Sequence, residues 1–259
     1  MSSGDDTARR GARRAEKVRV DQLLVDRGLA PSRTRAQALV LAGKVFHKEV
    51  RIDKPGTTVR TGDELEVRGE DHGYVSRGGV KLAGALDVFC MNVDGLRCLD
   101  VGASTGGFTD CLLQRNAKEV MAVDVGYGQL AHKLRTDPRV TVMERTNARA
   151  LTPDTIGGAV DLTVVDASFI GLGQLIDAIA ACTKRGGALV ALIKPQFEVG
   201  RDEAAKAKGV IRDTVVRKEA IDDVVDAVRS AGFSIEGQCD SSLPGPKGNV
   251  EAFVYARRT

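Results

Sequence analysis

Between residues 97 and 193, five short apolar segments alternate with segments of helical pattern, and this alternation constrains the fold more than any other feature. Strands that alternate with helices form mainly parallel sheets with helices on both faces. Two further strand patterns near the C-terminus are joined by a loop rich in proline and glycine, as adjacent antiparallel strands are. The sequence therefore predicts a doubly wound α/β domain with a seven-stranded sheet. The expected strands are 97–101, 120–125, 140–144, 161–165, 188–193, 233–239 and 250–255.

The composition is that of a globular protein without a membrane span. Hydrophobic residues make up 42% of the chain and charged residues 28%, and no apolar stretch approaches 18 residues. Residues 1–17 are polar and arginine-rich, so we expect a disordered leader rather than a signal peptide, and a cytoplasmic protein. An odd number of cysteines without CxxC spacing argues against a disulfide framework and against a metal site. The cysteines are Cys90, Cys98, Cys111, Cys182 and Cys239.

Positive charge is concentrated at the N-terminal end. Residues 1–60 contain 14 Lys and Arg against 7 Asp and Glu, whereas residues 61–259 contain 24 against 28. A module that binds a polyanion shows this segregation, because phosphate contacts need clustered cations. For the leader alone, a solvated tail explains the arginines equally well.

Residues 18–69 have the pattern of a small α+β module, followed by a linker at 70–73. A first helical pattern ends at Gly28, and Ser32 takes the N-cap position of a second one that ends at Gly43. Short strand-like runs follow. Cations on or beside the second helix can pair with phosphates, although ordinary solvated charges fit the spacing equally well. These cations are Arg33, Arg35 and Lys44.

A glycine-rich segment, Asp100-Val-Gly-Ala-Ser-Thr-Gly-Gly-Phe-Thr, follows the first expected strand of the α/β domain. It is neither a GxGxxG fingerprint nor a Walker A loop, which disfavours a pyrophosphate or triphosphate ligand. S-adenosylmethionine carries no phosphate and needs carboxylates and carbonyls instead. Asp124 ends the second strand and can accept hydrogen bonds from ribose hydroxyls, as it also would for NAD. The glycine loop favours S-adenosylmethionine.

Two charged residues follow neighbouring strands at the edge of the sheet where a ligand is expected, and two others would attract no notice on their own. Asp166 and Lys194 follow the fourth and fifth strands, and Pro195 should keep Lys194 out of helical geometry, beside Asp166. Glu251 opens the last strand, and Lys81 lies in the first helix. From the spacing alone, a catalytic set and an ordinary ion-pair network are both open.

The motifs of the C-terminal domain, residues 74–259, resemble those of the FtsJ-like ribose 2′-O-methyltransferases, and the whole chain resembles the TlyA family, historically labelled haemolysins. Residues 18–69 are similar to an RNA-binding domain first named from a ribosomal protein, except that Phe46-His47-Lys48-Glu49 replaces its usual Asn-Gly turn. The motifs that carry the C-terminal resemblance are Tyr74-Val-Ser-Arg-Gly-Gly, the glycine loop, Asp124-Val-Gly-Tyr-Gly-Gln-Leu, Lys194-Pro-Gln-Phe-Glu-Val-Gly and Pro244-Gly-Pro-Lys-Gly-Asn-Val-Glu.

The resemblance implies a class I, Rossmann-like methyltransferase that uses S-adenosylmethionine on ribosomal RNA or a ribosomal subunit, at cytidine 2′-hydroxyls. It implies the catalytic residues Lys81, Asp166, Lys194 and Glu251, with Lys194 as the base. The implied cofactor residues are Asp100, Gly102, Ser104, Gly106, Gly107, Phe108, Asp124 and Asn147. The implied RNA-binding residues are Arg19, Arg33, Arg35 and Lys44.

Three rival interpretations remain. Amino-group methylation of a base commonly uses a Pro-Pro-aromatic loop, which Asp166-Ala-Ser-Phe lacks, and carbon methylation needs a cysteine after the fourth or fifth strand. A membrane-active cytolysin needs a long amphipathic segment, whereas the expected helix 214–231 has an ordinary core-facing stripe. An inactive RNA-binding protein is disfavoured because all four catalytic positions are filled. The stripe consists of Val215, Ile221, Val225 and Val228.

Overall fold

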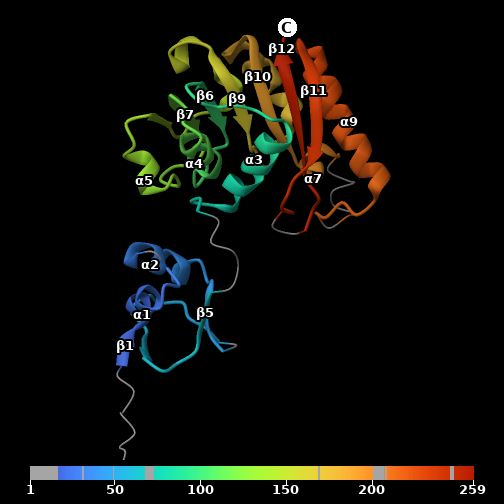
Figure 1. Ribbon diagram of the computed structural model, residues 1–259. Helices are drawn as coiled ribbons and strands as arrows, with labels where there is room; N and C mark the ends of the chain where they lie inside the picture. Colours follow the sequence, from blue (N-terminus) through green and yellow to red (C-terminus); the bar gives the residue numbers. More distant parts are fainter. Residues whose placement is uncertain are drawn as a thin grey trace, which may run out of the picture. The chain divides into compact units, whose positions relative to one another are not determined.

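A computed structural model describes residues 17–30, 32–48, 50–67, 73–168, 170–200, 207, 209–245 and 248–259 (Figure 1). The described residues form two compact units, one on each side of residues 68–72. The expected leader, except Lys17, and the expected linker, except Gly73, lie outside the described residues. So do four residues of the motifs quoted above, Glu49, Phe169, Pro246 and Lys247.

The N-terminal unit combines two short helices with two small sheets. Strand β1 pairs antiparallel with β4, and β2 pairs antiparallel with β3 and β5. The N-cap expected at Ser32 is confirmed, because its side chain accepts a hydrogen bond from the backbone N–H of Arg35 at 3.2 Å. The elements are β1 (Lys17–Arg19), α1 (Val20–Asp26), α2 (Arg33–Leu41), β2 (Val45–His47), β3 (Val50–Arg51), β4 (Thr58–Arg60) and β5 (Leu65–Val67).

One small hydrophobic core holds this unit together. Val20 and Leu24 of α1, Ala36 and Val40 of α2, and Val45 of β2 are fully buried against one another. Both helices thus place an apolar face on the strands, so most of their polar side chains stay at the surface.

The C-terminal unit is built around one sheet in the strand order β11-β12-β10-β9-β6-β7-β8 (Figure 1). Strands β10, β9, β6, β7 and β8 run parallel, and β12 pairs antiparallel with β10 and β11. The predicted doubly wound, seven-stranded α/β fold is confirmed. The strands are β6 (Arg97–Val101), β7 (Glu119–Val123), β8 (Val140–Met143), β9 (Val160–Val165), β10 (Thr183–Ile193), β11 (Phe233–Asp240) and β12 (Ala252–Arg258).

Helices cover both faces of this sheet and enclose two hydrophobic cores. Helices α3 and α4 pack together on one face, and α6 and α9 pack on the other (Figure 1). Successive residues of a strand point to opposite faces of the sheet. Cys98 therefore lies in the core beside α3 and α4, and Leu99 lies in the core beside α6 and α9. Burial on both faces explains why the strands read as continuous apolar runs. The helices are α3 (Arg77–Val88), α4 (Gly107–Gln114), α5 (His132–Arg135), α6 (Ile176–Cys182), α7 (Pro195–Glu198) and α9 (Thr214–Ser230), with 3₁₀ turns η1 (Ala148–Ala150), η2 (Asp154–Ile156) and η3 (Leu172–Gln174).

Three expectations about these elements are wrong. The last strand, expected at 250–255, runs from Ala252 to Arg258, so Glu251 precedes it rather than opening it. Strand β10 begins at Thr183 rather than 188, because Thr183 already pairs with Val160 of β9. The register of the pairing then shifts before Ala188. Val215 is 62% exposed and does not belong to the buried stripe of α9, to which Val224 contributes instead. The buried residues of α9 begin at Ala220, so the first turn of the helix contributes none to the core.

The strand order reverses between β6 and β9, and in doubly wound sheets ligands bind outside the carboxyl ends of the strands at such a point. The residues that follow β6 and β9 contact each other at this point. The N–H of Asp166 donates to the carbonyl of Val101 at 2.9 Å. A Cβ on Gly102 would lie only 2.7 Å from the carbonyl oxygen of Asp166, so glycine allows the two segments to touch.

Candidate active site

A cleft opens at the carboxyl ends of the parallel strands, at the reversal of strand order. It has two compartments of about 850 and 310 Å³, whose walls share Gly102, Ser104, Asp166 and Ser168. The four expected catalytic residues line the larger compartment, and Asp124 and Asn147 line the smaller one. The fold therefore brings together residues from seven separate segments of the chain.

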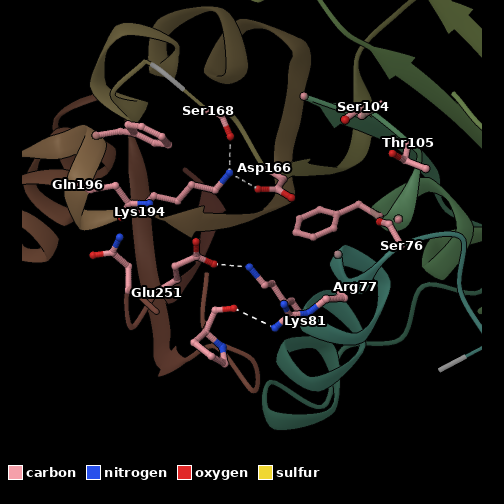
Figure 2. Close-up of a pocket in the computed structure, with 18 of the residues that line it drawn as sticks. Ser76, Arg77, Lys81, Ser104, Thr105, Asp166, Ser168, Lys194, Gln196 and Glu251 are labelled. Atoms are coloured by element: carbon pink, nitrogen blue, oxygen red, sulfur yellow. Dashed lines mark hydrogen bonds and ion pairs between the residues drawn. The ribbon is translucent and has the colours of Figure 1, made fainter. Parts of the chain in front are cut away.

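Lys194 enters the larger compartment directly from the end of β10. Pro195 occupies the first position of α7 and Lys194 keeps an extended backbone, φ −112° and ψ 97°, as expected. Its Nζ lies 2.6 Å from Oδ1 of Asp166 and donates to the hydroxyl of Ser168 at 2.7 Å (Figure 2). The side chain of Lys194 is 10% exposed. The expected contact with Asp166 is present, and little water screens it.

Lys81 and Glu251 form a second ion pair in the same compartment (Figure 2). Lys81 lies in the second turn of α3, and Glu251 immediately precedes β12. Their side chains are 9% and 1% exposed. Removal of either partner would leave a buried charge uncompensated, so the two residues depend on each other. Each lysine of the cleft thus has its own carboxylate.

The glycine loop between β6 and α4 brings backbone to the cleft wall. Gly102 and Ser104 have positive φ, 86° and 48°, a conformation that glycine adopts without strain. A Cβ on Gly107 would collide with the side chain of Ser76 at the start of α3. Gly107 and Phe108 line the larger compartment beside Ser104. The loop therefore joins the two compartments through backbone rather than through long side chains.

Asp124 and Asn147 follow β7 and β8 and face the smaller compartment. Each carboxylate oxygen of Asp124 accepts one backbone N–H, from Ser104 at 2.8 Å and from Gly126 at 2.6 Å. A carboxylate offers about four acceptor positions, so both oxygens can accept a further hydrogen bond. The side-chain oxygen of Asn147 caps η1 by accepting the N–H of Arg149 at 3.1 Å.

Asp100 and Gly106 were also expected at the cofactor, but they line neither compartment. Gly106 faces the side chains of Leu130 and Leu134 in the protein interior. Asp100 is fully buried, and its Oδ2 accepts the backbone N–H and the hydroxyl of Thr109 at 2.9 and 2.6 Å. Burial raises the pKa of Asp100 to about 7, against the opposing effect of these hydrogen bonds. Both residues therefore lie on the interior side of the glycine loop, away from the cleft.

In the N-terminal unit, a buried carboxylate holds two of the four cations expected to bind RNA. Asp21 accepts Nε and NH2 of Arg19 at 2.9 and 2.8 Å and Nε of Arg33 at 3.3 Å. Arg19 holds the pKa of Asp21 well below its usual range. The two arginines stay about half exposed, 49% and 52%, so their guanidinium groups are oriented but accessible. The other two expected cations are Arg35, on α2, and Lys44, after it.

Ser168 and Asn249 also line the larger compartment, and neither was among the expected site residues. The hydroxyl of Ser168 accepts a hydrogen bond from Lys194. Ser168 lies two positions after Asp166, so it could have been predicted as a further residue that follows β9. Asn249 is 3% exposed, and it donates to the carbonyl of Gly209 at 2.9 Å and accepts the N–H of Ile211 at 2.8 Å. A contact between such distant segments leaves no signal in the local pattern.

Comparisons with known proteins identify the two units. The sequence matches the FtsJ-like methyltransferase family over residues 74–258 and the S4 domain over residues 18–65. The 16S/23S rRNA (cytidine-2′-O)-methyltransferase TlyA of Mycobacterium tuberculosis is 49% identical, over 94% of this chain and 91% of its own. Hemolysin A of Brachyspira hyodysenteriae is 37% identical, over 92% of this chain and 99% of its own.

A solved structure has the same architecture. It belongs to a protein from Streptococcus thermophilus described as a hemolysin, with a TM-score of 0.73 and 42% identity, and the alignment covers 94% of this chain and 89% of that one. The resemblance read from the motifs is thereby confirmed. Because these matches extend over nearly the whole chain and both domains are present, the protein belongs to the TlyA family of FtsJ-like methyltransferases.

Proposed function

We propose that this protein transfers a methyl group from S-adenosylmethionine to the 2′-hydroxyl of a cytidine in ribosomal RNA, in the cytoplasm. The observation that carries the proposal is the placement of two lysine–carboxylate pairs, Lys194–Asp166 and Lys81–Glu251, in one compartment at the reversal of strand order. The relative from Mycobacterium tuberculosis, whose name includes this reaction on 16S and 23S rRNA, supports the choice of substrate.

S-adenosylmethionine suits the smaller compartment and the wall that it shares with the larger one. Its ribose hydroxyls need acceptors, and Asp124 has one free acceptor position on each oxygen. Its adenine needs an apolar slot with a polar group at the edge, which Val125, Ile170 and Asn147 provide. Gly102 and Ser104 line both compartments and would hold the cofactor there, and its sulfonium would supply the electrophilic methyl group.

Lys194 is placed to take the proton of the 2′-hydroxyl. A ribose hydroxyl is a poor nucleophile, so it must be aligned in line with the methyl group and lose its proton during the transfer. In this proposal Nζ of Lys194 is the base that takes the proton as the methyl group passes to the oxygen. Asp166, 2.6 Å away, stabilises the resulting ammonium, and Ser168 fixes the direction of the side chain.

Lys81 and Glu251 complete the site from the other side of the compartment. Lys81 can direct an N–H toward the reacting oxygen and stabilise the negative charge that develops there. Glu251 holds Lys81 in place through the buried ion pair. The two lysines therefore have different tasks, one removing a proton and the other stabilising charge.

The N-terminal unit, an S4 domain, would hold the RNA through its phosphates. Arg19 and Arg33 are fixed by Asp21 with half of each side chain accessible, which lowers the entropy lost on binding. Arg35 and Lys44 would add further phosphate contacts. This division assigns affinity for RNA to one unit and chemistry to the other.

The name of the Brachyspira hyodysenteriae relative, Hemolysin A, makes membrane lysis the second candidate. Within the described ranges, no helix is long and apolar enough to span a bilayer. Helix α9 buries Ile221, Val225 and Val228 in the core, so its apolar side is already occupied. A dye-leakage assay with liposomes and purified protein separates the candidates, because a methyltransferase leaves the dye enclosed.

The direct test supplies the purified protein with radiolabelled S-adenosylmethionine and ribosomal RNA from cells that lack the gene. Separate reactions with naked RNA and with each ribosomal subunit identify the form that is accepted. We expect label on cytidine 2′-oxygens, mapped by mass spectrometry of nucleosides. Label on a base, or no label on any of these substrates, would contradict the proposal.

A further inference from the structure

The carboxylate of Glu251 is held between Lys81 and the loop that joins β11 to β12. Oε2 pairs with Nζ of Lys81, whereas Oε1 faces Gly245 in the loop. A Cβ built on Gly245 would lie 2.5 Å from Oε1 and 3.2 Å from Cδ of Glu251. The carboxylate therefore fills the space that any side chain at position 245 would need.

The backbone at Gly245 does not itself require glycine. Its φ lies outside the left-handed region, unlike that of Gly248, which is 90°. The third atom nearest to the built Cβ is the carbonyl oxygen of Asn249 at 3.6 Å, an ordinary contact. The same carbonyl accepts the N–H of Gly245 at 2.9 Å, which fixes the loop against Glu251. Among the described residues, the carboxylate of Glu251 is what excludes a side chain here.

We propose that Gly245 is a positioning residue, which keeps the carboxylate of Glu251 on Lys81 and so fixes Lys81 in the cleft. The inference rests on the catalytic role proposed above for that pair. A methyl group at position 245 meets the end of a flexible side chain and no rigid backbone atom, so the carboxylate moves and the fold tolerates the change. The move separates Glu251 from Lys81.

We expect Gly245→Ala to reduce activity while the protein still folds. The single-turnover rate of methyl transfer to ribosomal RNA should fall about 100-fold, the loss typical of a displacement near 1 Å at a reacting centre. The affinity for S-adenosylmethionine should stay at the wild-type value, and the melting temperature should fall no further than in Glu251→Ala, which breaks the same buried ion pair. Gly200→Ala is the matched control, because Gly200 also has φ outside the left-handed region and a Cβ there meets no atom within 4 Å.

A double-mutant cycle shows whether the added methyl group acts through Glu251. In a Glu251→Ala background no carboxylate is left to displace, so Gly245→Ala should cause no further loss of rate. Equal losses in both backgrounds, or a single variant with a rate within about twofold of wild type, would overturn the proposal.

The ammonium group of Lys81 provides a readout that does not depend on activity. In a buried ion pair its protons exchange slowly with water, and ¹⁵N NMR detects them, with Lys81→Ala identifying the signal. We expect the signal in wild type and in Gly200→Ala, and its loss in Gly245→Ala. If wild type methylates no ribosomal RNA, the proposed function has failed, and this spectrum still decides the role of Gly245. An unchanged Lys81 signal in Gly245→Ala refutes it.

Discussion

Replacement of Asp100 by asparagine should change how stability depends on pH. The carboxyl of Asp100 is fully buried behind the glycine loop, and burial raises its pKa from 3.8 to about 7. Because the pKa is higher in the folded state, the folded protein binds more protons than the unfolded chain between about pH 4 and pH 7. The stability that this protonation contributes is complete below that range and is lost as the pH rises through it.

The size of the effect follows from the two pKa values. The difference between them lowers the free energy of unfolding by about 4 kcal/mol in all as the pH rises, and about 3 kcal/mol of this loss falls between pH 5 and pH 8. In Asp100→Asn the amide oxygen can still accept both hydrogen bonds from Thr109. The amide nitrogen takes the place of Oδ1, which has no partner within the described part of the chain, and this costs about 1–3 kcal/mol at every pH.

Urea unfolding followed by circular dichroism at pH 5, 6.5 and 8 measures the difference in unfolding free energy between wild type and Asp100→Asn. We expect this difference to shift by about 3 kcal/mol in favour of the variant from pH 5 to pH 8. Asp223→Asn, at an exposed position of α9, is the control and should show no shift. A difference for Asp100→Asn that is the same at all three pH values would refute the reasoning.

Three further predictions concern the proposed sites. Asp124→Ala should weaken the binding of S-adenosylmethionine by about 1–3 kcal/mol in calorimetry, because two ribose hydroxyls lose their acceptor, and an unchanged affinity would remove Asp124 from the cofactor site. Lys194→Ala and Lys194→Arg should both slow single-turnover transfer by about 100-fold to 10,000-fold, since arginine cannot lose its proton, and a near-normal rate for the arginine variant rules out Lys194 as the base. Arg33→Ala should lower the salt dependence of RNA binding by about one unit of slope while cofactor affinity stays the same, and equal slopes would place Arg33 away from the phosphates.

The fold was largely predictable because its main elements carry local signals. Strands buried on both faces are continuous apolar runs, so β6 is predicted at its observed bounds and β9 within one residue. The start of β10 escaped prediction because Lys184 to Gly187 have no strand pattern, and the strand reaches back to Thr183 through the pairing of that residue with Val160 of β9. Val215 was misassigned because helical periodicity shows which residues share a face, but not where along the helix the core ends.

The site was predictable where the fold alone determines proximity. Asp166 and Lys194 follow adjacent parallel strands, so their contact could be inferred from the sheet. Lys81 and Glu251 are 170 positions apart and pair across the helix layer and the last strand, which spacing cannot reveal, and only the family resemblance indicated them. Asp100 was misplaced because the position of an acid beside a glycine loop does not show whether its side chain points toward the cleft or into the core.

The arrangement of charges explains why two domains are needed. In the cleft Lys81 and Lys194 are each paired with a carboxylate, and Asp124 adds a negative charge to the adjoining compartment. Paired charges offer little long-range attraction to a polyanion. Residues 61–259 as a whole carry more acidic than basic side chains, 28 against 24. Residues 1–60 carry 14 basic against 7 acidic side chains, and a positive excess of this kind attracts a polyanion. The catalytic unit can then keep its lysines paired for chemistry rather than use them for binding.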